Sequence, residues 1–332
     1  MFKFLNSIFS NDATSDNYPE TIVHAAIEHA VDSTDPWIRA VFSYERKLRP
    51  AVIRAIDYVV TLVDTMATPI VVEPGSYESN ALLRTFFFSK DDMLRVLAND
   101  RNLMSFLKGQ ADAPPLVFAL LVMAKQEKVI IGAELSGDIV LHDIPQTVVS
   151  FEAHRLLDPS VSEVEARHHA KRRLFNHLLG LALRRIVTVK TERGKLERYR
   201  SILQSKLDLL QRAGWGFNET TGDEHLDVTG IEVLISRLEA QLQELGGDDR
   251  MLEVYLDIVA DVLSQPEQHL WARKESLVIN RMGVKRSKDD GNTPEVTLDM
   301  FANDEGRSMV VTLTALAGDV IWPERAEPFR CR

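Results

Sequence analysis

The chain has 332 residues, of which 45% are hydrophobic, and a formal net charge of −10 at pH 7. This length suffices for one large or two medium domains, and the composition excludes a wholly disordered chain. The acidic balance argues against general binding to nucleic acid or to an anionic membrane, so only a local basic face could bind either. The single cysteine, Cys331, excludes an intrachain disulfide and a cysteine-based metal cluster, and it fits a reducing cytoplasm.

Residues 1–17 are predicted to be an N-terminal tail or amphipathic segment. No run in the chain reaches the roughly 18 to 20 apolar residues that span a bilayer. A helical apolar stripe in the tail is formed by Phe2, Phe4, Leu5, Ile8 and Phe9. We expect this segment to dock on its own domain. Contact of residues 1–10 with a membrane is the less favoured alternative, because one lysine, Lys3, attracts anionic lipid only weakly.

Residues 18–157 are predicted to form a helical region that ends in a small antiparallel β meander. Amphipathic periodicity and start signals predict helices beginning near Glu20, Pro36, Pro50 and Ser89 and after Pro115. The last of these would carry Leu116, Phe118, Leu120 and Leu121. From about Lys128 the pattern becomes β-branched and alternating, so the segments KVIIGAEL, DIVLHD and PQTVVSF predict the meander.

The most distinctive feature lies in residues 158–265, where a basic stretch is followed directly by an acidic one. Residues 161–212 hold thirteen Lys and Arg against five Asp and Glu, whereas residues 213–261 hold two against twelve. We predict a long basic helix over 161–212, capped by Ser160 or Ser162, and acidic helices over 229–263. Together they would form an antiparallel helical hairpin.

A seven-residue apolar ladder supports this hairpin. On the basic helix it runs through Phe175, Ala182, Val189, Leu196, Leu203 and Leu210, with a companion row at Leu179, Ile186 and Leu207. The matching seam of the acidic helix comprises Ile231, Leu234, Leu238, Leu242 and Leu245. Arg193 and Arg200 interrupt the companion row, which is typical of polar residues that set register. Antiparallel pairing predicts Arg200 near Gln241 or Glu244, and Arg193 near Asp248 or Asp249.

The last part of the chain, residues 266–332, is predicted to be a C-terminal β section. Its strand segments are SLVINRMGV, EVTLDMFA and RSMVVTLTAL, and the last two are joined across Asn303–Gly306, a hairpin signal. These strands could complete one sheet with the meander. The fold class is therefore α+β and predominantly α, with the helical N-terminal region, the meander, the hairpin and the C-terminal antiparallel strands in that order.

The sequence contains one weak candidate for a metal site. Glu165 lies three residues before His168 and four before His169, so a carboxylate and an imidazole could share one helical face. A second Glu-x-x-His motif is missing, and the flanking arginines and lysine oppose a cation. We therefore interpret the histidines as surface residues and predict no metal and no cofactor. Nucleotide-binding, zinc-protease, nucleophile-elbow and EF-hand motifs are also absent from the sequence.

Trp215 and Phe217 alternate with Gly214 and Gly216 at the predicted tip of the hairpin. Burial against the stem is the favoured interpretation, since aromatic side chains contribute much area on packing, and exposure to a partner is the alternative.

The sequence leaves three functional hypotheses, and we recognise no family resemblance that would decide among them. The leading hypothesis is a cytoplasmic, bacterial-type interaction or scaffold protein that contacts another protein, or itself, through the hairpin or its tip, with Trp215, Phe217, Arg193 and Arg200 as interaction residues. The second is an enzyme whose dispersed site, without a motif, lies between the helical and β regions. The third is nucleic-acid binding by the basic helix. Whether the protein is an enzyme is left open by the sequence.

Overall fold

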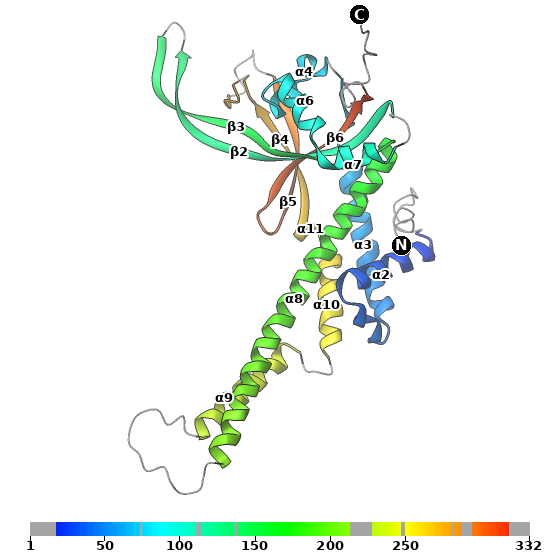
Figure 1. The fold of residues 1–332 in the computed structure, drawn as a ribbon, viewed down its shortest axis with the longest axis vertical. Coiled ribbons are helices and arrows are strands. Elements are labelled where there is room, and N and C mark those ends of the chain that lie inside the picture. The colour runs from blue at the N-terminus through cyan, green and yellow to red at the C-terminus, as the bar shows by residue number, and fades with distance from the viewer. Residues whose placement is uncertain are drawn as a thin grey trace, which may run out of the picture. The chain divides into compact units, whose positions relative to one another are not determined.

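The computed structural model describes residues 18–73, 75–110, 114–136, 139–212, 228–246, 250–280, 282–286 and 294–318. They form a mixed structure of helices and one sheet (Figure 1), which confirms the α+β class. The chain divides into two compact units. Among the described residues, the first unit comprises 56–175 and 266–318, and the second comprises 18–55 and 176–265. Helices α3 and α8 contribute residues to both.

The first unit contains a six-stranded sheet with the order β3-β2-β6-β5-β4, and β1 pairs with β6 off this path. The strands are β1 (Ile70–Val72), β2 (Leu116–Ser136), β3 (Ile139–Ser160), β4 (Leu270–Val278), β5 (Glu295–Asn303) and β6 (Ser308–Ala317). All pairings are antiparallel except that of β1 with β6. The predicted union of the central and C-terminal strands in one sheet is therefore confirmed.

The two outer strands of this order are connected to each other. Val148 of β3 bridges to Val284, and the Val149 amide donates to the Gly283 carbonyl at 2.8 Å. Ile279, the residue after β4, bridges to Lys285. The sheet therefore curls until residues 282–286 join its ends.

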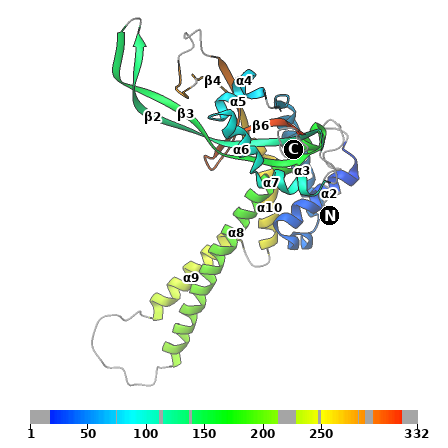
Figure 2. The same cartoon turned by 45° about the horizontal axis from the view of Figure 1, so that its top comes forward.

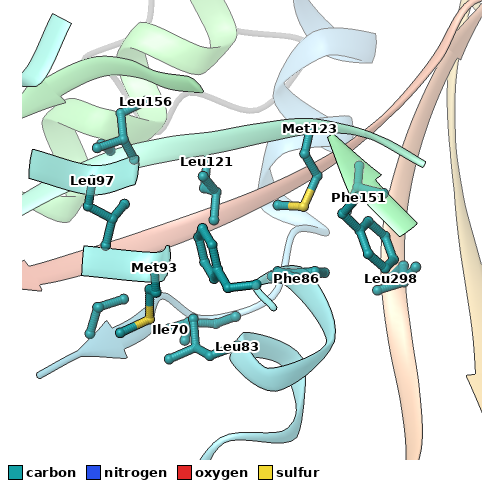
Figure 3. Packing of buried hydrophobic residues seen from close by; sticks show 14 of the residues in the cluster. Ile70, Leu83, Phe86, Met93, Leu97, Leu121, Met123, Phe151, Leu156 and Leu298 are labelled. Carbon is teal, nitrogen blue, oxygen red and sulfur yellow. The ribbon is translucent and has the colours of Figure 1, made fainter. Parts of the chain in front are cut away.

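Short helices pack on this sheet and supply the core of the first unit. They are α4 (Ser76–Ser79), α5 (Ala81–Phe86), α6 (Lys90–Ala98) and α7 (Arg101–Lys108), with α11 (Pro266–His269) before β4. Their buried side chains, among them Leu83, Phe86 and Met93, meet Leu121 and Phe151 of the sheet (Figure 3). Phe86 and Phe151 lie edge to face, with ring centroids 5.4 Å apart, a favourable aromatic geometry.

The second unit is helical. Its elements are α2 (Glu20–Thr34), the 3-10 helix η1 (Pro36–Ala40), the first part of α3 (Tyr44–Asp64), most of α8 (Glu163–Arg212), α9 (Val228–Glu244) and α10 (Met251–Ser264). Helix α2 buries the stripe that its periodicity predicts, Ile22, Val23, Ala26, Ile27, Ala30 and Val31. Helix α10 likewise buries Tyr255, Val259 and Val262.

Several local signals in the sequence are confirmed by their hydrogen bonds. The Ser89 hydroxyl accepts from the Asp92 amide at 3.1 Å, and the Ser162 hydroxyl accepts from the Glu165 amide at 3.2 Å. Helix α8 then continues unbroken for 50 residues. Gly306, with φ of 74°, lies in the turn between β5 and β6, where glycine adopts the left-handed conformation without strain.

The sequence prediction fails in the segment before α8. The helix predicted after Pro115 is strand β2, because an interior strand with neighbours on both edges can be apolar on both faces and then lacks alternation. The predicted meander is instead one hairpin of two long strands. The region before Lys128 is not all-α either, since β1 joins the sheet. Helix α7 was also not predicted.

Candidate interaction surface

Helix α8 is anchored in the second unit by charged side chains around Asp35. The Lys190 ammonium group lies 2.5 Å from the carboxylate of Asp35, which is buried and also accepts from the Trp37 amide at 2.9 Å. Lys190 also lies 4.9 Å from the centre of the Tyr255 ring. Burial raises the pKa of the Tyr255 phenol despite the opposing charge of Lys190. These contacts fix α8 to the segment after α2 and to α10.

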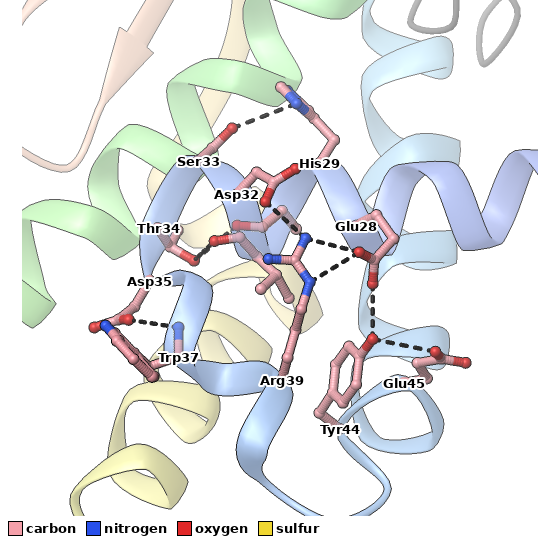
Figure 4. A network of polar contacts seen from close by, with 12 residues as sticks. Glu28, His29, Asp32, Ser33, Thr34, Asp35, Trp37, Arg39, Tyr44 and Glu45 are labelled. Atoms are coloured by element: carbon pink, nitrogen blue, oxygen red, sulfur yellow. Dashed lines mark hydrogen bonds and ion pairs between the residues drawn. The ribbon is translucent and has the colours of Figure 1, made fainter. Parts of the chain in front are cut away.

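A polar network holds the connection between α2 and α3 (Figure 4). Arg39 donates to Glu28 at 2.7 and 3.0 Å and to Asp32 at 2.6 Å, and the Tyr44 hydroxyl donates to Glu28 at 2.7 Å. Partial burial would raise the pKa of Glu28, but the donors Arg39 and Tyr44 outweigh it and lower that pKa. The network is structural, because its members bond to one another.

Seven of the thirteen basic residues of α8 form ion pairs with carboxylates of the same chain. Their ion pairs are Arg167–Glu163, Lys171–Asp64, Arg173–Asp158, Arg185–Asp261, Lys190–Asp35, Arg193–Glu197 and Lys195–Glu192. None of these partner carboxylates belongs to α9. The reversal of charge along the sequence therefore does not act through ion pairs between α8 and α9 in the part of the chain that the structure describes.

Apolar contacts pair α9 with the C-terminal part of α8. Leu203 of α8 and Ile231, Ile235 and Leu238 of α9 form a buried cluster, against which Leu196, Leu207 and Leu234 pack. Both ribbon views show the two helices side by side (Figures 1 and 2). Most of these residues belong to the predicted seam. An apolar seam with coiled-coil spacing holds the pair together.

The two arginines that interrupt the companion row differ in their contacts. The Arg193 side chain is 12% exposed, bonds to Glu197 at 2.7 Å and donates to the Gly246 carbonyl at 2.5 Å, just beyond the end of α9. Its predicted neighbours, Asp248 and Asp249, lie outside the described residues. Arg200 is half-buried and makes no ion pair among the described contacts.

A second apolar stripe follows the outer surface of α8 beyond Arg193. Tyr199, Ile202 and Leu209 are 49%, 58% and 67% exposed. At 100° per residue, measured from Leu196 on the face that contacts α9, Tyr199 lies about 60° away, Ile202 about 120° and Leu209 about 140°. Exposed basic residues lie on the same face, Lys195 and Lys206, and beside it, Arg198. Isolated exposed apolar residues are ordinary, but three on one face of one helix mark a surface suited to a partner.

Sequence reasoning missed this stripe. Its signal was present, since Ile202 and Leu209 are seven residues apart and Tyr199 precedes Ile202 by three. Leu203 and Leu210 of the predicted ladder, each one residue further along the chain, have the same seven-residue spacing. Only the position of α9 shows that Leu203 of the ladder is covered and the stripe is not. The predicted tip residues Trp215 and Phe217 lie outside the described residues.

The three residues of the weak metal candidate are half-buried, whereas the histidines were expected at the surface. Glu165, His168 and His169 lie near the start of α8, and no group of three or more possible ligands that could hold a metal ion occurs among the described residues. The Nδ1 atom of His169 is buried without a hydrogen-bond partner in the described structure.

The first unit contains an open depression of about 670 Å³ where the sheet splits. Strand β5 pairs with β6 only at Met300–Ala302, and β1 occupies the same edge of β6 from Thr314 to Leu316. The depression lies between them, and its carboxylates are Glu73 and Asp299, with no histidine among its described lining residues. Hydroxyl groups dominate the remaining polar lining. Two of them, those of Ser76 and Ser79, already bond to the local backbone.

Comparison with models of protein families, with curated proteins and with solved structures finds no match to this chain. None of the described helices combines the length and the apolar character needed to cross a membrane.

Proposed function

We propose that this protein is an interaction or scaffold protein that docks a partner helix along the outer surface of α8. The observation that carries the proposal is the exposed stripe of Tyr199, Ile202 and Leu209. These residues extend over about 15 Å of helix at 1.5 Å per residue. Spacings of three and seven residues are those through which one helix packs on another.

The charges around the stripe define the partner. Arg198 and Lys206 are exposed and make no ion pair among the described contacts, while Lys195 pairs only with the exposed Glu192. A helix that brings apolar residues to the stripe would place its flanking residues against these cations. The favoured partner is therefore an amphipathic helix with acidic flanks, because opposite charges steer association and disfavour wrong partners.

The alternatives have less support. An enzyme with a dispersed site would gather several carboxylates or histidines in one pocket, and the depression in the first unit holds two carboxylates. Nucleic-acid binding would require several free cations on α8. Seven of the thirteen Lys and Arg residues of this helix have carboxylate partners in the chain. No binding at low salt would remove the nucleic-acid hypothesis.

Two synthetic amphipathic peptides with the same leucine positions test the proposal, one with glutamate flanks and one with lysine flanks. Fluorescence anisotropy on the full chain should show at least about tenfold tighter binding of the glutamate peptide. Ile202→Asp should remove this binding. Val233→Asp is the matched control, because Val233 is 64% exposed on the face of α9 that points away from α8. Equal binding of both peptides, or unchanged binding by Ile202→Asp, overturns the proposal.

The predicted tip needs a separate test. Trp215→Ala and Phe217→Ala should change the oligomeric state or the set of partners recovered with the full chain if the tip is the contact. If neither changes, the tip is not the interaction site, and the stripe on α8 is judged by the peptide experiment alone.

A further inference from the structure

The hairpin of β2 and β3 extends beyond the rest of the sheet in the first unit (Figures 1 and 2). Strand β2 pairs with β6 from Leu116 to Met123 only. From Ala124 to Ser136 its only strand partner among the described residues is β3. One edge of this ribbon is therefore an open row of backbone donors and acceptors.

The open edge carries large apolar side chains. Val129, Ile130 and Ile131 are 72%, 46% and 74% exposed. Successive residues of a strand point to opposite faces, so Val129 and Ile131 lie on one face and Ile130 on the other. Soluble proteins usually protect such an edge with charges, proline or a bulge, because an open apolar edge recruits another strand.

The other edge of the ribbon is partly occupied in the chain itself. Val148 of β3 bridges to Val284, and the Lys285 amide donates to the Thr147 carbonyl at 2.8 Å. Thr147 pairs with Val129 across the hairpin. An added strand can therefore join this part of the ribbon along β2.

We propose that the open edge of β2 pairs with the same edge of a second copy of this chain, antiparallel about a two-fold axis at Ile130. This register places Ile130 opposite its own copy and Val129 opposite Ile131 of the second copy. Cross-strand pairs of β-branched residues stabilise a sheet. A two-fold contact of this kind uses the same surface on both copies.

The charges near the edge agree with this register. Lys128 would stand opposite Gly132, so no like charges meet directly. A parallel arrangement in register would instead place Lys128 beside its own copy, which is repulsive. The charges of Lys125 and Glu127 do not oppose this register, because Lys125 already pairs with Glu127 at 2.8 Å and with Glu275 at 2.5 Å.

The geometry of the ribbon favours a second copy over a helix as the occupant. A helix would cover one face of the ribbon, whereas a second ribbon joined at the edge extends both faces and shelters Val129, Ile130 and Ile131 together. The contact is also small compared with the roughly 1,600 Å² of a standard interface, so we expect a reversible dimer whose population rises with concentration. This inference is independent of the helical site on α8.

Cysteine cross-linking of the full chain tests the register. The native cysteine is removed by Cys331→Ser, and Ile130→Cys then places one thiol on the proposed axis, where mild oxidation with diamide should form a disulfide dimer. Lys128→Cys in the same background is the matched control. Its two thiols would be about 13 Å apart, too far for a disulfide. Equal cross-linking of both variants, or none at Cys331→Ser/Ile130→Cys, overturns the register.

Sedimentation velocity over a concentration series tests the dimer itself. The unmodified chain should dimerise reversibly, and Ile130→Lys should weaken the dimer by at least about tenfold, because two lysines would then face each other. Val161→Lys, at a residue 54% exposed outside the hairpin, should dimerise like the unmodified chain. A chain that stays monomeric at all concentrations, or an Ile130→Lys variant that dimerises normally, contradicts the proposal. Circular dichroism of each variant verifies that the fold is retained.

Discussion

Within the second unit, both parts of helix α8 carry regularly spaced apolar residues, but they differ in how many of these residues are buried. Residues 176–190 bury Leu178, Leu179, Ala182 and Ile186, and Lys190 binds the buried Asp35. From residue 191 onward Leu203 is the buried residue among those whose side chains are described. The proximal part, residues 176–190, belongs to the hydrophobic core because several helices surround it. The distal part, from residue 191 onward, has one described neighbour, α9. The number of neighbours therefore determines whether an apolar residue on α8 stabilises the fold or remains open to a partner.

The largest expected effect comes from truncating leucines in the two parts. Leu178→Ala should lower the free energy of unfolding by about 3 kcal/mol, because Leu178 is fully buried and its removal leaves a cavity. Leu209→Ala should change it by less than about 0.5 kcal/mol. Urea denaturation of both variants measures the difference. Equal losses would mean that Leu209 is buried in the folded chain and that the contrast between the two parts is wrong.

The anchor of the proximal part should show the next largest effect. Lys190→Met leaves the carboxylate of Asp35 buried without its cation, and we expect a loss of about 2 kcal/mol. This is less than for a fully buried pair, because Lys190 is half-exposed. Asp35→Asn added to Lys190→Met should restore part of the stability, since the amide oxygen can still accept from the Trp37 amide. A double variant less stable than Lys190→Met would contradict this explanation.

A smaller effect should separate the two arginines of the distal part. Arg193→Ala removes the bonds to Glu197 and to the Gly246 carbonyl and should cost about 1 kcal/mol. Arg200→Ala should cost less than about 0.5 kcal/mol. Amide hydrogen exchange of α9 reports the difference, because Arg193 holds the chain at the end of that helix. Faster exchange in Arg200→Ala than in Arg193→Ala would mean that Arg200, and not Arg193, stabilises α9 more strongly.

The smallest expected effect is a dependence on acid in the network beside the proximal part. The pKa of Glu28 lies below its ordinary value of 4.5 in the folded chain, so this group stabilises the fold above that value. The contribution is lost as the pH falls from about 4.5 through the lowered pKa. Urea denaturation between about pH 5 and pH 3 should show the loss, and Arg39→Gln should reduce it. A pH dependence unchanged by Arg39→Gln would assign the loss to other carboxylates.

Local signals in the sequence were sufficient wherever one segment fixes its own structure. Ser89 and Ser162 cap helices as predicted because a side-chain acceptor three residues before a free amide needs no distant partner. The helix predicted after Pro115 failed for the opposite reason. Leu120 and Leu121 pair with residues far along the chain, and an apolar run alone does not distinguish a buried strand from a helix.

The candidate site shows the same division. The seam through Leu203 and Leu238 was predicted from its spacing, whereas Tyr199, Ile202 and Leu209 were not singled out. Their spacing alone resembles that of a buried seam. They became a candidate surface only when the structure placed α9 against another face of α8.

The sequence by itself determined the mixed fold class, the long helix α8, its cap, the seam with α9 and the turn between β5 and β6, because periodicity, capping and turn chemistry act over a few residues. The tertiary structure decided which apolar residues are covered and which carboxylates pair with the basic residues of α8. It also decided that, among the described residues, β2 has β3 as its only strand partner beyond Met123. The physical reason is that burial and ion pairing depend on neighbours distant in sequence, and no local pattern encodes their positions.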